Sequence, residues 1–578
     1  MDRTRVACDR CHKRKIKCFN SIQGCRQCAD LGIVCKSERP LLKPGRKPTA
    51  VKVHISEPRP PGYPILHSLR PHGVGDDSIN GQPRLCSTQD ACHLLENFFS
   101  SPDQIPHGTL LRRHSILRSD GFRECTASLL LSILSHLGHG DRARLRNALH
   151  ARSLALMEPV FLHKTEPCFD DAVTTYMLCS ISTSDDENHK YLPHRMMYFN
   201  YLMKQLQINV VPEGTSVTEE EREERCRLWW GAYVVDKHSS FSFNWRPTFA
   251  ESECRYIRRP CRDEIWMADG ELYLGDEAEP PQGLGYEVVS LDWFGIFVPL
   301  AAILSDILEY HYLRQHPSLG SNTALHETLR STIVQNMGTF DRSVRDLIAR
   351  TRRASQTSNS SSDHAGISVM VLDSGQLRDL DRDFEEECPS EPRMLLYAWH
   401  MLHCMYTILY GKLDPVDIFQ DTDWLLSKDF LIAAEHADKC TKVTAQILRR
   451  DPKLHQCYRL FGTYFLHSSF IFLSLARKLR HSADEYILNS CRTYLRTLEA
   501  FQATVNIKYQ KTFARVLQDT IAKCVEAQHQ LQLGNTEAVV TTASDEDWLD
   551  PALLNYRWTV GHSGLWNGDM GRQLETKK

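Results

Sequence analysis

The chain has 578 residues, of which 42% are hydrophobic and 24% charged, with a formal net charge of −3 at pH 7. It is long enough to bury a large core. Its longest apolar run, residues 293–304, contains Pro299 and is shorter than a bilayer requires, so we expect no membrane association. Residues 1–5 are charged where a signal peptide needs an apolar core, which favours an intracellular, reducing location.

Six of the 20 cysteines lie in the first 35 residues, and their spacing, Cys-x2-Cys-x6-Cys, occurs twice: Cys8, Cys11, Cys18, Cys25, Cys28 and Cys35. Structural zinc takes four tetrahedral ligands and prefers thiolate sulfur. One ion would leave two cysteines unused, whereas two ions need eight metal–sulfur bonds, which six thiolates supply if two of them bridge. The pattern therefore predicts two zinc ions per chain. The other 14 cysteines are scattered, as small core residues are.

The two halves of this cysteine pattern have identical spacing, which predicts a pseudo-twofold module with one cysteine-led helical turn in each half. About 35 residues cannot bury enough apolar surface to fold alone. Metal binding contributes on the order of 10 kcal/mol to such modules, so we expect this one to be unfolded without zinc. Disulfides do not suit a reducing compartment, and metal storage does not require basic residues between the cysteines.

Positive charge is concentrated at the same end of the chain. Residues 1–50 contain 13 Lys and Arg against 4 Asp and Glu, a net charge of +9, which leaves −12 on the remainder. The run of residues 13–17 lies between the second and third cysteines and, with Lys43, Arg46 and Lys47, could also serve nuclear import. This charge distribution favours a polyanionic partner, and inside a six-cysteine cluster it indicates double-stranded DNA.

The segment Cys11-His12-Lys13-Arg14-Lys15-Ile16-Lys17-Cys18 resembles the fungal binuclear zinc cluster (Zn2Cys6) transcription factors. The resemblance implies that Cys8 and Cys25 bridge the two ions and that the first helix enters the major groove. It places Arg14 and Lys15 against the guanines of a CGG-like half-site. The residues expected to contact DNA are Arg10, His12, Lys13, Arg14, Lys15 and Lys17, of which Arg10, Lys13 and Lys17 would contact phosphates.

Two features depart from the family pattern. The loop of residues 19–24 lacks the proline of many members, and Phe19 stands where Asp is frequent. The ligand set is intact, but the relative orientation of the two halves, and with it the base contacts, is left open. A protein-interaction module or co-regulator without its own DNA specificity is the alternative function.

Residues 37–87 are basic and rich in proline, which predicts an extended linker. Arg46 and Lys47 could reach the minor groove. We find no sustained heptad of apolar residues between Lys36 and Cys86. Without a visible coiled coil, the chain could bind DNA as a monomer or as a homodimer formed through the large domain, and both possibilities stay open.

A large all-α regulatory domain is expected to follow the small cluster module with its two short helices. Apolar residues recur at three-to-four spacing in nine segments, 124–137, 145–157, 196–206, 219–241, 296–315, 395–413, 430–449, 458–479 and 485–502. Breaks are predicted at residues 269–287 and 352–366, the second with a low-complexity serine run. The predicted domains are residues 1–36 (cluster), 37–87 (linker), 88–350 and 391–533 (helical regulatory region), 351–390 (disordered loop) and 534–578 (tail).

Residues 223–237, Glu-Glu-Arg-Cys-Arg-Leu-Trp-Trp-Gly-Ala-Tyr-Val-Val-Asp-Lys, predict an amphipathic helix with acidic residues in its first turn. Core packing alone would explain them. They are also similar to the middle homology region of the same family, as are residues 240–247 and 263–266, and the likeness is to the branch of xylanolytic and related carbon-source activators. Cys226 and Lys237 stand where Arg is usual, and Trp245 interrupts the common Asn-Arg-Pro.

No catalytic residue is predicted, and we expect the chain not to be an enzyme. His326 begins a zinc-protease pattern, but Arg330 stands where the second His must be, and residues 561–564 fall short of a nucleophile elbow. Two groups have ligand-like spacing on helices but are expected to be core residues: His136 with His139, and His400 with His403 and Cys404.

The tail, residues 534–578, mixes acidic residues with aromatic residues and leucines. This composition suits an activation segment that folds on a coactivator, and equally a last packed element. Taken together, the sequence predicts a nuclear, zinc-dependent, sequence-specific regulator of RNA polymerase II transcription. Its expected partners are DNA and the transcription machinery or a coactivator, and a small-molecule effector stays open.

Overall fold

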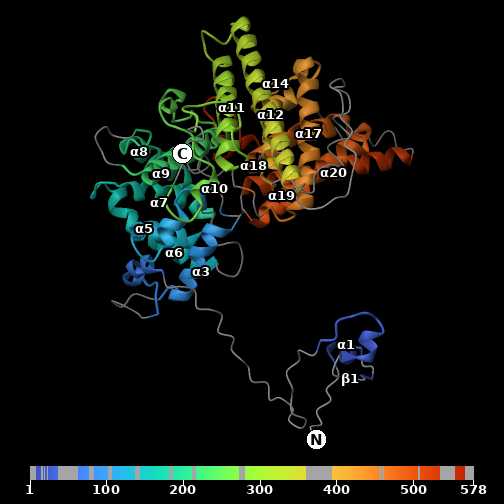
Figure 1. The fold of residues 1–578 in the computed structure, drawn as a ribbon. Helices are drawn as coiled ribbons and strands as arrows, with labels where there is room; N and C mark the ends of the chain where they lie inside the picture. Colours follow the sequence, from blue (N-terminus) through green and yellow to red (C-terminus); the bar gives the residue numbers. More distant parts are fainter. Residues whose placement is uncertain are drawn as a thin grey trace. The chain divides into compact units, whose positions relative to one another are not determined.

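The computed structural model describes residues 8–14, 17–18, 20–21, 24–36, 63–76, 84–101, 104, 107–136, 143–180, 186–210, 217–272, 280–359, 393–454, 457, 461–504, 508–533 and 553–566. The chain divides into two compact units, Met1–Arg59 and Pro60–Lys578. Figure 1 shows the small unit around α1 and β1 and the large helical unit that contains α3 to α20.

The described residues of the small unit form four short elements, α1 (Asp9–Lys13), β1 (Asn20–Ser21), β2 (Gly24–Cys25) and α2 (Arg26–Ala29). The strands are antiparallel, with Asn20 opposite Cys25 and Ser21 opposite Gly24. Helices of four and five residues are far below the length at which an isolated helix is stable in water. Among the described residues of this unit, the buried cluster consists of cysteines alone, so we expect the unit to be stabilised by the metal ions that they bind.

The first part of the helical unit packs α5 against α6 and α7, and α7 against α8. Its elements are the 3-10 helices η1 (Pro64–His72) and η3 (His107–Thr109) and the helices α3 (Thr88–Ser100), α4 (Arg113–Leu117), α5 (Ala127–Ser135), α6 (Ala143–Phe161), α7 (Phe169–Ser180), α8 (Asp186–Gln205) and α9 (Glu219–Phe243).

In the second part, α14 packs on α17, and α18, α19 and α20 pack in series. The elements are η4 (Glu251–Cys254), α10 (Asp263–Trp266), α11 (Trp293–Arg314), α12 (Thr323–Asn359), α14 (Arg393–Tyr410), α15 (Pro415–Gln420), α16 (Thr422–Leu425), α17 (Lys428–Arg450), α18 (Phe461–Leu479), η5 (Arg480–Ser482), α19 (Glu485–Thr504), α20 (Lys508–Gln532), η7 (Leu553–Asn555) and η8 (Gly564–Trp566). The predicted fold class, a small cluster module followed by a large helical region, is confirmed.

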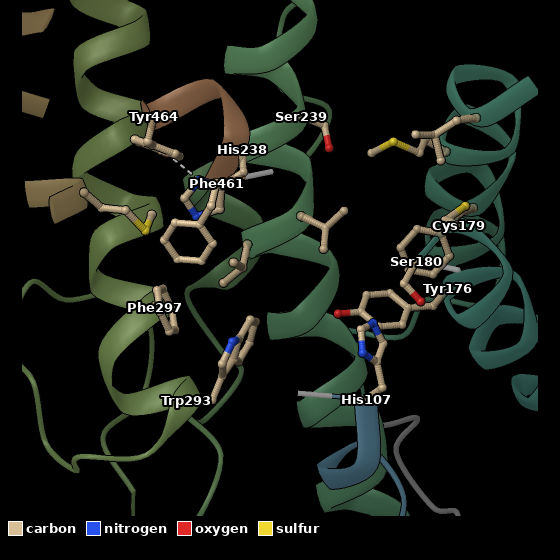
Figure 2. Close-up of a pocket in the computed structure, with 16 residues that line it drawn as sticks. His107, Tyr176, Cys179, Ser180, His238, Ser239, Trp293, Phe297, Phe461 and Tyr464 are labelled. Atoms are coloured by element: carbon tan, nitrogen blue, oxygen red, sulfur yellow. Dashed lines mark hydrogen bonds between the residues drawn. The ribbon is translucent and has the colours of Figure 1, made fainter. Parts of the chain in front are cut away.

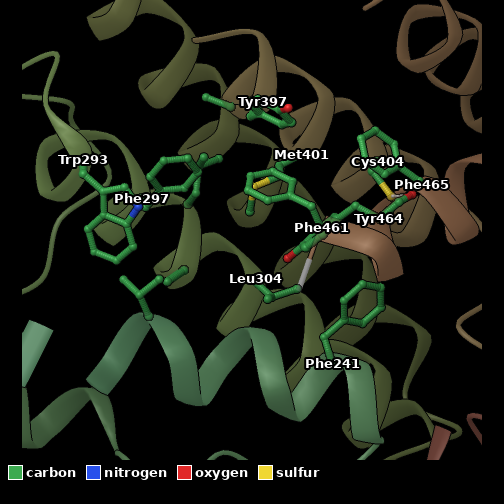
Figure 3. Close-up of a cluster of buried hydrophobic side chains, with 14 of the residues drawn as sticks. Phe241, Trp293, Phe297, Leu304, Tyr397, Met401, Cys404, Phe461, Tyr464 and Phe465 are labelled. Carbon is green, nitrogen blue, oxygen red and sulfur yellow. Dashed lines mark hydrogen bonds between the residues drawn. The ribbon is translucent and has the colours of Figure 1, made fainter. Parts of the chain in front are cut away.

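Helices α9, α11, α14 and α18 meet in an aromatic core, which Figure 3 shows. The ring of Phe461 on α18 lies 4.8 Å from that of Tyr397 on α14 and 6.1 Å from that of Phe297 on α11. Such edge and tilted contacts add to the stabilisation from burial alone. Helices α9 and α18 lie more than 200 positions apart in the sequence, so this core joins the two parts of the helical unit.

Helix α11 is the most apolar of these four helices. By length and composition it could cross a membrane, but 89% of its most apolar window is buried inside the protein. The helix has 22 residues, longer than the 12-residue apolar run seen in the sequence, because half-buried polar positions such as Asp306 continue it.

All nine predicted helical segments contain a helix, but four long helices were not predicted: α3, α7, α12 and α20. The hydroxyls of Thr174 and Thr175 on α7 donate to carbonyls of the preceding turn, so this helix buries polar residues that disturb its apolar pattern. Helix α12 also continues to Asn359, so residues 351–359 were wrongly placed in a disordered break. Good helix formers, Arg352, Arg353 and Ala354, extend the helix beyond its packed part. Residues 360–392 lie outside the described residues.

The predicted linker is wrong in its second half. Residues 64–72 form η1, in which Ile65, Leu66 and Leu69 are buried against the helical core. Burial of these three apolar side chains stabilises a short helix in this segment, although its proline content had predicted an extended chain. Residues 37–62 lie outside the described residues.

Residues 553–566 of the tail pack on the helical unit, which agrees with the packed element that was one of the two alternatives left open for the tail. Trp558 is 1% exposed, and its indole N–H donates to the carbonyl of Phe241 at 2.7 Å. Gly564 has φ of +50° and leaves no room for a side chain, because a Cβ there would lie 2.6 Å from the carbonyl oxygen of Ser242. The remainder of the tail lies outside the described residues.

Candidate metal centre and nucleic-acid interface

The six N-terminal cysteines converge on one point of the small unit. Their Sγ atoms form two groups of four in which all atoms lie within 4.8 Å of one another: Cys8, Cys11, Cys18 and Cys25, and Cys8, Cys25, Cys28 and Cys35. Cys8 and Cys25 belong to both groups. This is the arrangement expected of two four-coordinate metals that share two bridging sulfurs.

The sulfur–sulfur distances test whether zinc fits. A tetrahedral site with Zn–S bonds of about 2.3 Å has sulfur–sulfur edges of about 3.8 Å. The Sγ atoms of Cys8 and Cys28 are 3.8 Å apart, and those of Cys11 and Cys25 are 3.6 Å apart. No disulfide joins any cysteine that the structure describes. The spacing therefore fits thiolates arranged around metal ions, and the module binds two zinc ions.

The two shared cysteines occupy equivalent positions, since Cys8 directly precedes α1 and Cys25 directly precedes α2. A helix N-terminus presents free backbone N–H groups and favours negative charge. The N–H of Cys11 lowers the pKa of the Cys8 thiol to about 6, whereas desolvation raises the pKa of Cys28 to about 12. The local backbone thus favours a thiolate at Cys8, the sulfur that would carry two metal bonds.

Four of the predicted DNA-contacting residues can be placed. Lys13, Arg14 and Lys17 are exposed, and Arg10 on α1 is half-buried. The side chain of His12 is not described, and Lys15 lies outside the described residues. Lys13 and Arg14 stand at the end of α1, so the helix that begins at the sulfur cluster presents positive charge to solvent.

The second sequence segment singled out, residues 223–237, lies in α9, which begins with a capping box between Thr218 and Glu221. Trp229 and Trp230 are buried, as core packing requires. Arg227 is fully buried and donates to Glu223 at 2.9 Å and to Asp263 at 2.7 Å. This ion pair network joins α9 to α10, the two elements that carry the family-like sequence.

The histidines and the cysteine of the helical unit that have metal-ligand-like spacing contact other protein groups. His400 shares a hydrogen bond with Ser468, His403 pairs with His436, and the Cys404 thiol lies against the carbonyl of Tyr464. The ring of His136 packs against that of His107 in a tilted arrangement, and His139 lies outside the described residues. His326 bonds to the carbonyls of Leu319 and Gly320. Within the described ranges, only the six N-terminal cysteines are grouped closely enough to hold a metal.

Two family models match the chain. The fungal Zn(2)-Cys(6) binuclear cluster domain matches residues 6–44, which include all six cysteines, and the fungal specific transcription factor domain matches residues 172–282, from α7 through α10. In these two segments the chain is similar to the fungal Zn2Cys6 transcription factors. Several of its curated relatives are named xylanolytic transcriptional activators.

The relatives share the sequence at moderate identity. The xylanolytic transcriptional activator xlnR of Aspergillus kawachii is 31% identical over 61% of this chain and 37% of the relative. That of Aspergillus niger is 32% identical over the same shares, and that of Emericella nidulans is 31% identical over 54% of this chain and 35% of the relative. The chain spans little more than a third of the length of these relatives. No solved structure matches it.

Sequence reasoning missed a cavity in the helical unit that His107, Ser239 and Trp293 help to line. These three residues lie more than 50 positions from one another in the sequence, and no local spacing connects them. Ser239 lies on α9 between the two family-like stretches, residues 223–237 and 240–247, which were the only sequence signal near it.

Proposed function

We propose that the chain is a zinc-dependent, sequence-specific DNA-binding regulator of RNA polymerase II transcription that acts in the nucleus. The observation that carries this proposal is the pair of four-sulfur groups sharing Cys8 and Cys25, with exposed Lys13 and Arg14 on the helix that starts there. The metal cluster would fold the DNA-binding module, and the positive charge at the end of α1 would attract the phosphates of DNA. Both matched families consist of transcription factors, and the proposal assigns no reaction to the chain.

The proposed zinc ligands are the six cysteines, with Cys8 and Cys25 bridging. Arg14 and Lys15 are proposed to read a CGG-like half-site, since Arg and Lys pair with the O6 and N7 acceptors of guanine. Arg10, Lys13 and Lys17 would contact phosphates and so position the helix on the DNA, and His12 is a further proposed DNA contact. One buried guanidinium nitrogen of Arg10 has no hydrogen-bond partner among the described residues, and a phosphate oxygen would supply one.

We propose that the helical unit regulates this activity, through a ligand, a coactivator or dimerisation. The match to the fungal specific transcription factor domain supports a regulatory role for α7 to α10. The packing of residues 553–566 on α9 and α18 restricts any activation segment in the tail to residues outside that range.

The decisive test is selection from randomised duplex DNA with the full chain, zinc-loaded and zinc-stripped, at near-physiological salt. Enrichment of CGG-containing sites only with zinc supports the proposal. A single selected half-site would indicate a monomer, and two half-sites at fixed spacing would indicate a dimer. Zinc binding with no enrichment on any sequence would contradict it and favour a protein-docking role for the cluster.

A further inference from the structure

A cavity of about 130 Å³ lies inside the helical unit, where both of its parts contribute walls. Figure 2 shows His107 and the α7 residues Tyr176 and Cys179 on one side of α9, and Trp293 and Phe461 from α11 and α18 on the other. Dry cavities of about 150 Å³ accept benzene in other proteins. The space therefore suits a molecule of about that size.

The wall of the cavity is apolar and uncharged. None of its sixteen lining residues, all of them described, has a carboxylate, an ammonium or a guanidinium group. Desolvation lowers the pKa of His107 to about 4 and that of His238 to about 3, so both imidazoles are neutral at pH 7. The Nδ1 atom of His238 is already engaged with the hydroxyl of Tyr464 at 2.6 Å.

Ser239 supplies the polar feature that points to an occupant. It lines the cavity from α9, is 0% exposed, and its hydroxyl has no hydrogen-bond partner among the described residues. Buried hydroxyls on helices ordinarily donate to a carbonyl of the preceding turn. Thr174 and Ser468 do so here, but Ser239 does not. A buried polar group without a partner is costly, and a ligand oxygen would supply the missing hydrogen bond.

We propose that this cavity is a binding site for a small, neutral, largely apolar molecule that carries one hydroxyl or carbonyl group, such as an aromatic alcohol, with Ser239 bonding that group. Aromatic side chains at Trp293 and Phe461 would contact its ring. The inference is independent of DNA binding, because it concerns the helical unit alone.

The same wall disfavours two other ligand classes. An anion or cation would find no charge of opposite sign among the lining residues. A sugar has a hydroxyl on nearly every carbon, and most of these would be buried without partners against Phe297, Met401 and Phe461. The cavity is thus suited to an apolar molecule, although the relatives carry the name xylanolytic.

The test compares three probes on the full zinc-loaded chain by isothermal titration calorimetry and thermal shift: benzyl alcohol, toluene and xylose. We expect benzyl alcohol to bind, toluene to bind about fivefold more weakly because it lacks one hydrogen bond, and xylose not to bind. In Ser239→Ala, benzyl alcohol should lose about fivefold in affinity and toluene should be unaffected. Ser240→Ala is the matched control, because Ser240 is also fully buried and unpartnered in the described structure but does not line the cavity.

A second variant, Val235→Phe, fills the cavity from α9 and should abolish binding of both aromatic probes. If it fails to fold, Ser239→Ala still decides the question. No saturable binding of either aromatic probe would overturn the proposal, as would tighter binding of xylose or equal benzyl alcohol affinities in the wild type and Ser239→Ala. The same variants should retain zinc-dependent DNA selection whether or not the probes bind the cavity. A failure of the DNA-binding proposal would therefore be seen separately from a failure of the cavity proposal.

Discussion

The backbone nitrogen of Cys8 lies 3.4 Å from the sulfur of Cys18, and ten residues separate the two. The same relationship recurs between Cys25 and Cys35 at 3.3 Å. Each pair consists of a shared cysteine and the last cysteine of its own half. The repeated sequence spacing has therefore produced repeated geometry, which gives the cluster its pseudo-twofold form.

Replacing a shared sulfur should cost both metal ions. Cys8→Ser removes one atom from each group of four, so we expect the zinc content of the purified chain to fall from two ions to near zero. Cys168→Ser changes an exposed cysteine outside the cluster and should retain two ions. Zinc measured by atomic absorption provides the readout, and one tightly retained ion in Cys8→Ser would show that Cys8 does not bridge.

Chelation of zinc should unfold the small unit and leave the helical unit intact. In the part of the small unit that the structure describes, the buried cluster contains only cysteines, whereas the helical unit has its own hydrophobic core. We expect amide exchange protection at residues 24–36 to be lost after treatment with a strong chelator, with no change in the melting temperature of the helical unit. A simultaneous loss of protection in α11 would contradict this independence.

Two lysines should affect DNA binding differently. Lys15→Ala is expected to cost about 1–3 kcal/mol on a CGG-containing site and to relax base choice, whereas Lys13→Ala should weaken binding to all sequences alike. Fluorescence anisotropy on cognate and scrambled duplexes measures both effects. Equal losses on both duplexes for both variants would defeat the assignment.

Removing a buried cation should destabilise the helical unit strongly. Arg227→Met leaves Glu223 and Asp263 without their buried partner, so we expect a loss of about 3–5 kcal/mol in the free energy of unfolding. Arg246→Met breaks an exposed pair with Glu309 and should cost less than about 1 kcal/mol. Urea denaturation gives both values, and similar losses for the two variants would contradict the burial argument.

The packed end of the chain should contribute to stability. Trp558→Ala removes a buried indole that also packs on His467, and we expect a loss of about 3–5 kcal/mol. Val560→Ala alters a side chain that is 79% exposed and should change stability by less than about 0.5 kcal/mol. Unchanged stability in Trp558→Ala would place the segment outside the folded core. Whether the tail activates transcription is a separate question, which fusion of residues 534–578 to an unrelated DNA-binding domain tests with a reporter gene.

The cluster could be predicted from the sequence because its determinants are local. Metal coordination requires cysteines at short, repeated spacings. All six ligands, from Cys8 to Cys35, lie within one segment, so their spacing alone predicts the metal site. The nine predicted helices were also visible, since each carries an apolar face that its own residues define. Helix α7 was missed because polar residues such as Thr174 are buried along it and interrupt the period.

The cavity, the buried ion pairs and the docked end of the chain were decided by tertiary structure alone. Arg227 meets Asp263, and Trp558 meets Phe241, across separations that no sequence period records. The sequence by itself determined the metal module, the position of the basic charge and the helical class of the remainder, because these depend on neighbouring residues. Which polar groups are buried, and which of them lack a partner as Ser239 does, depends on how distant helices pack against one another.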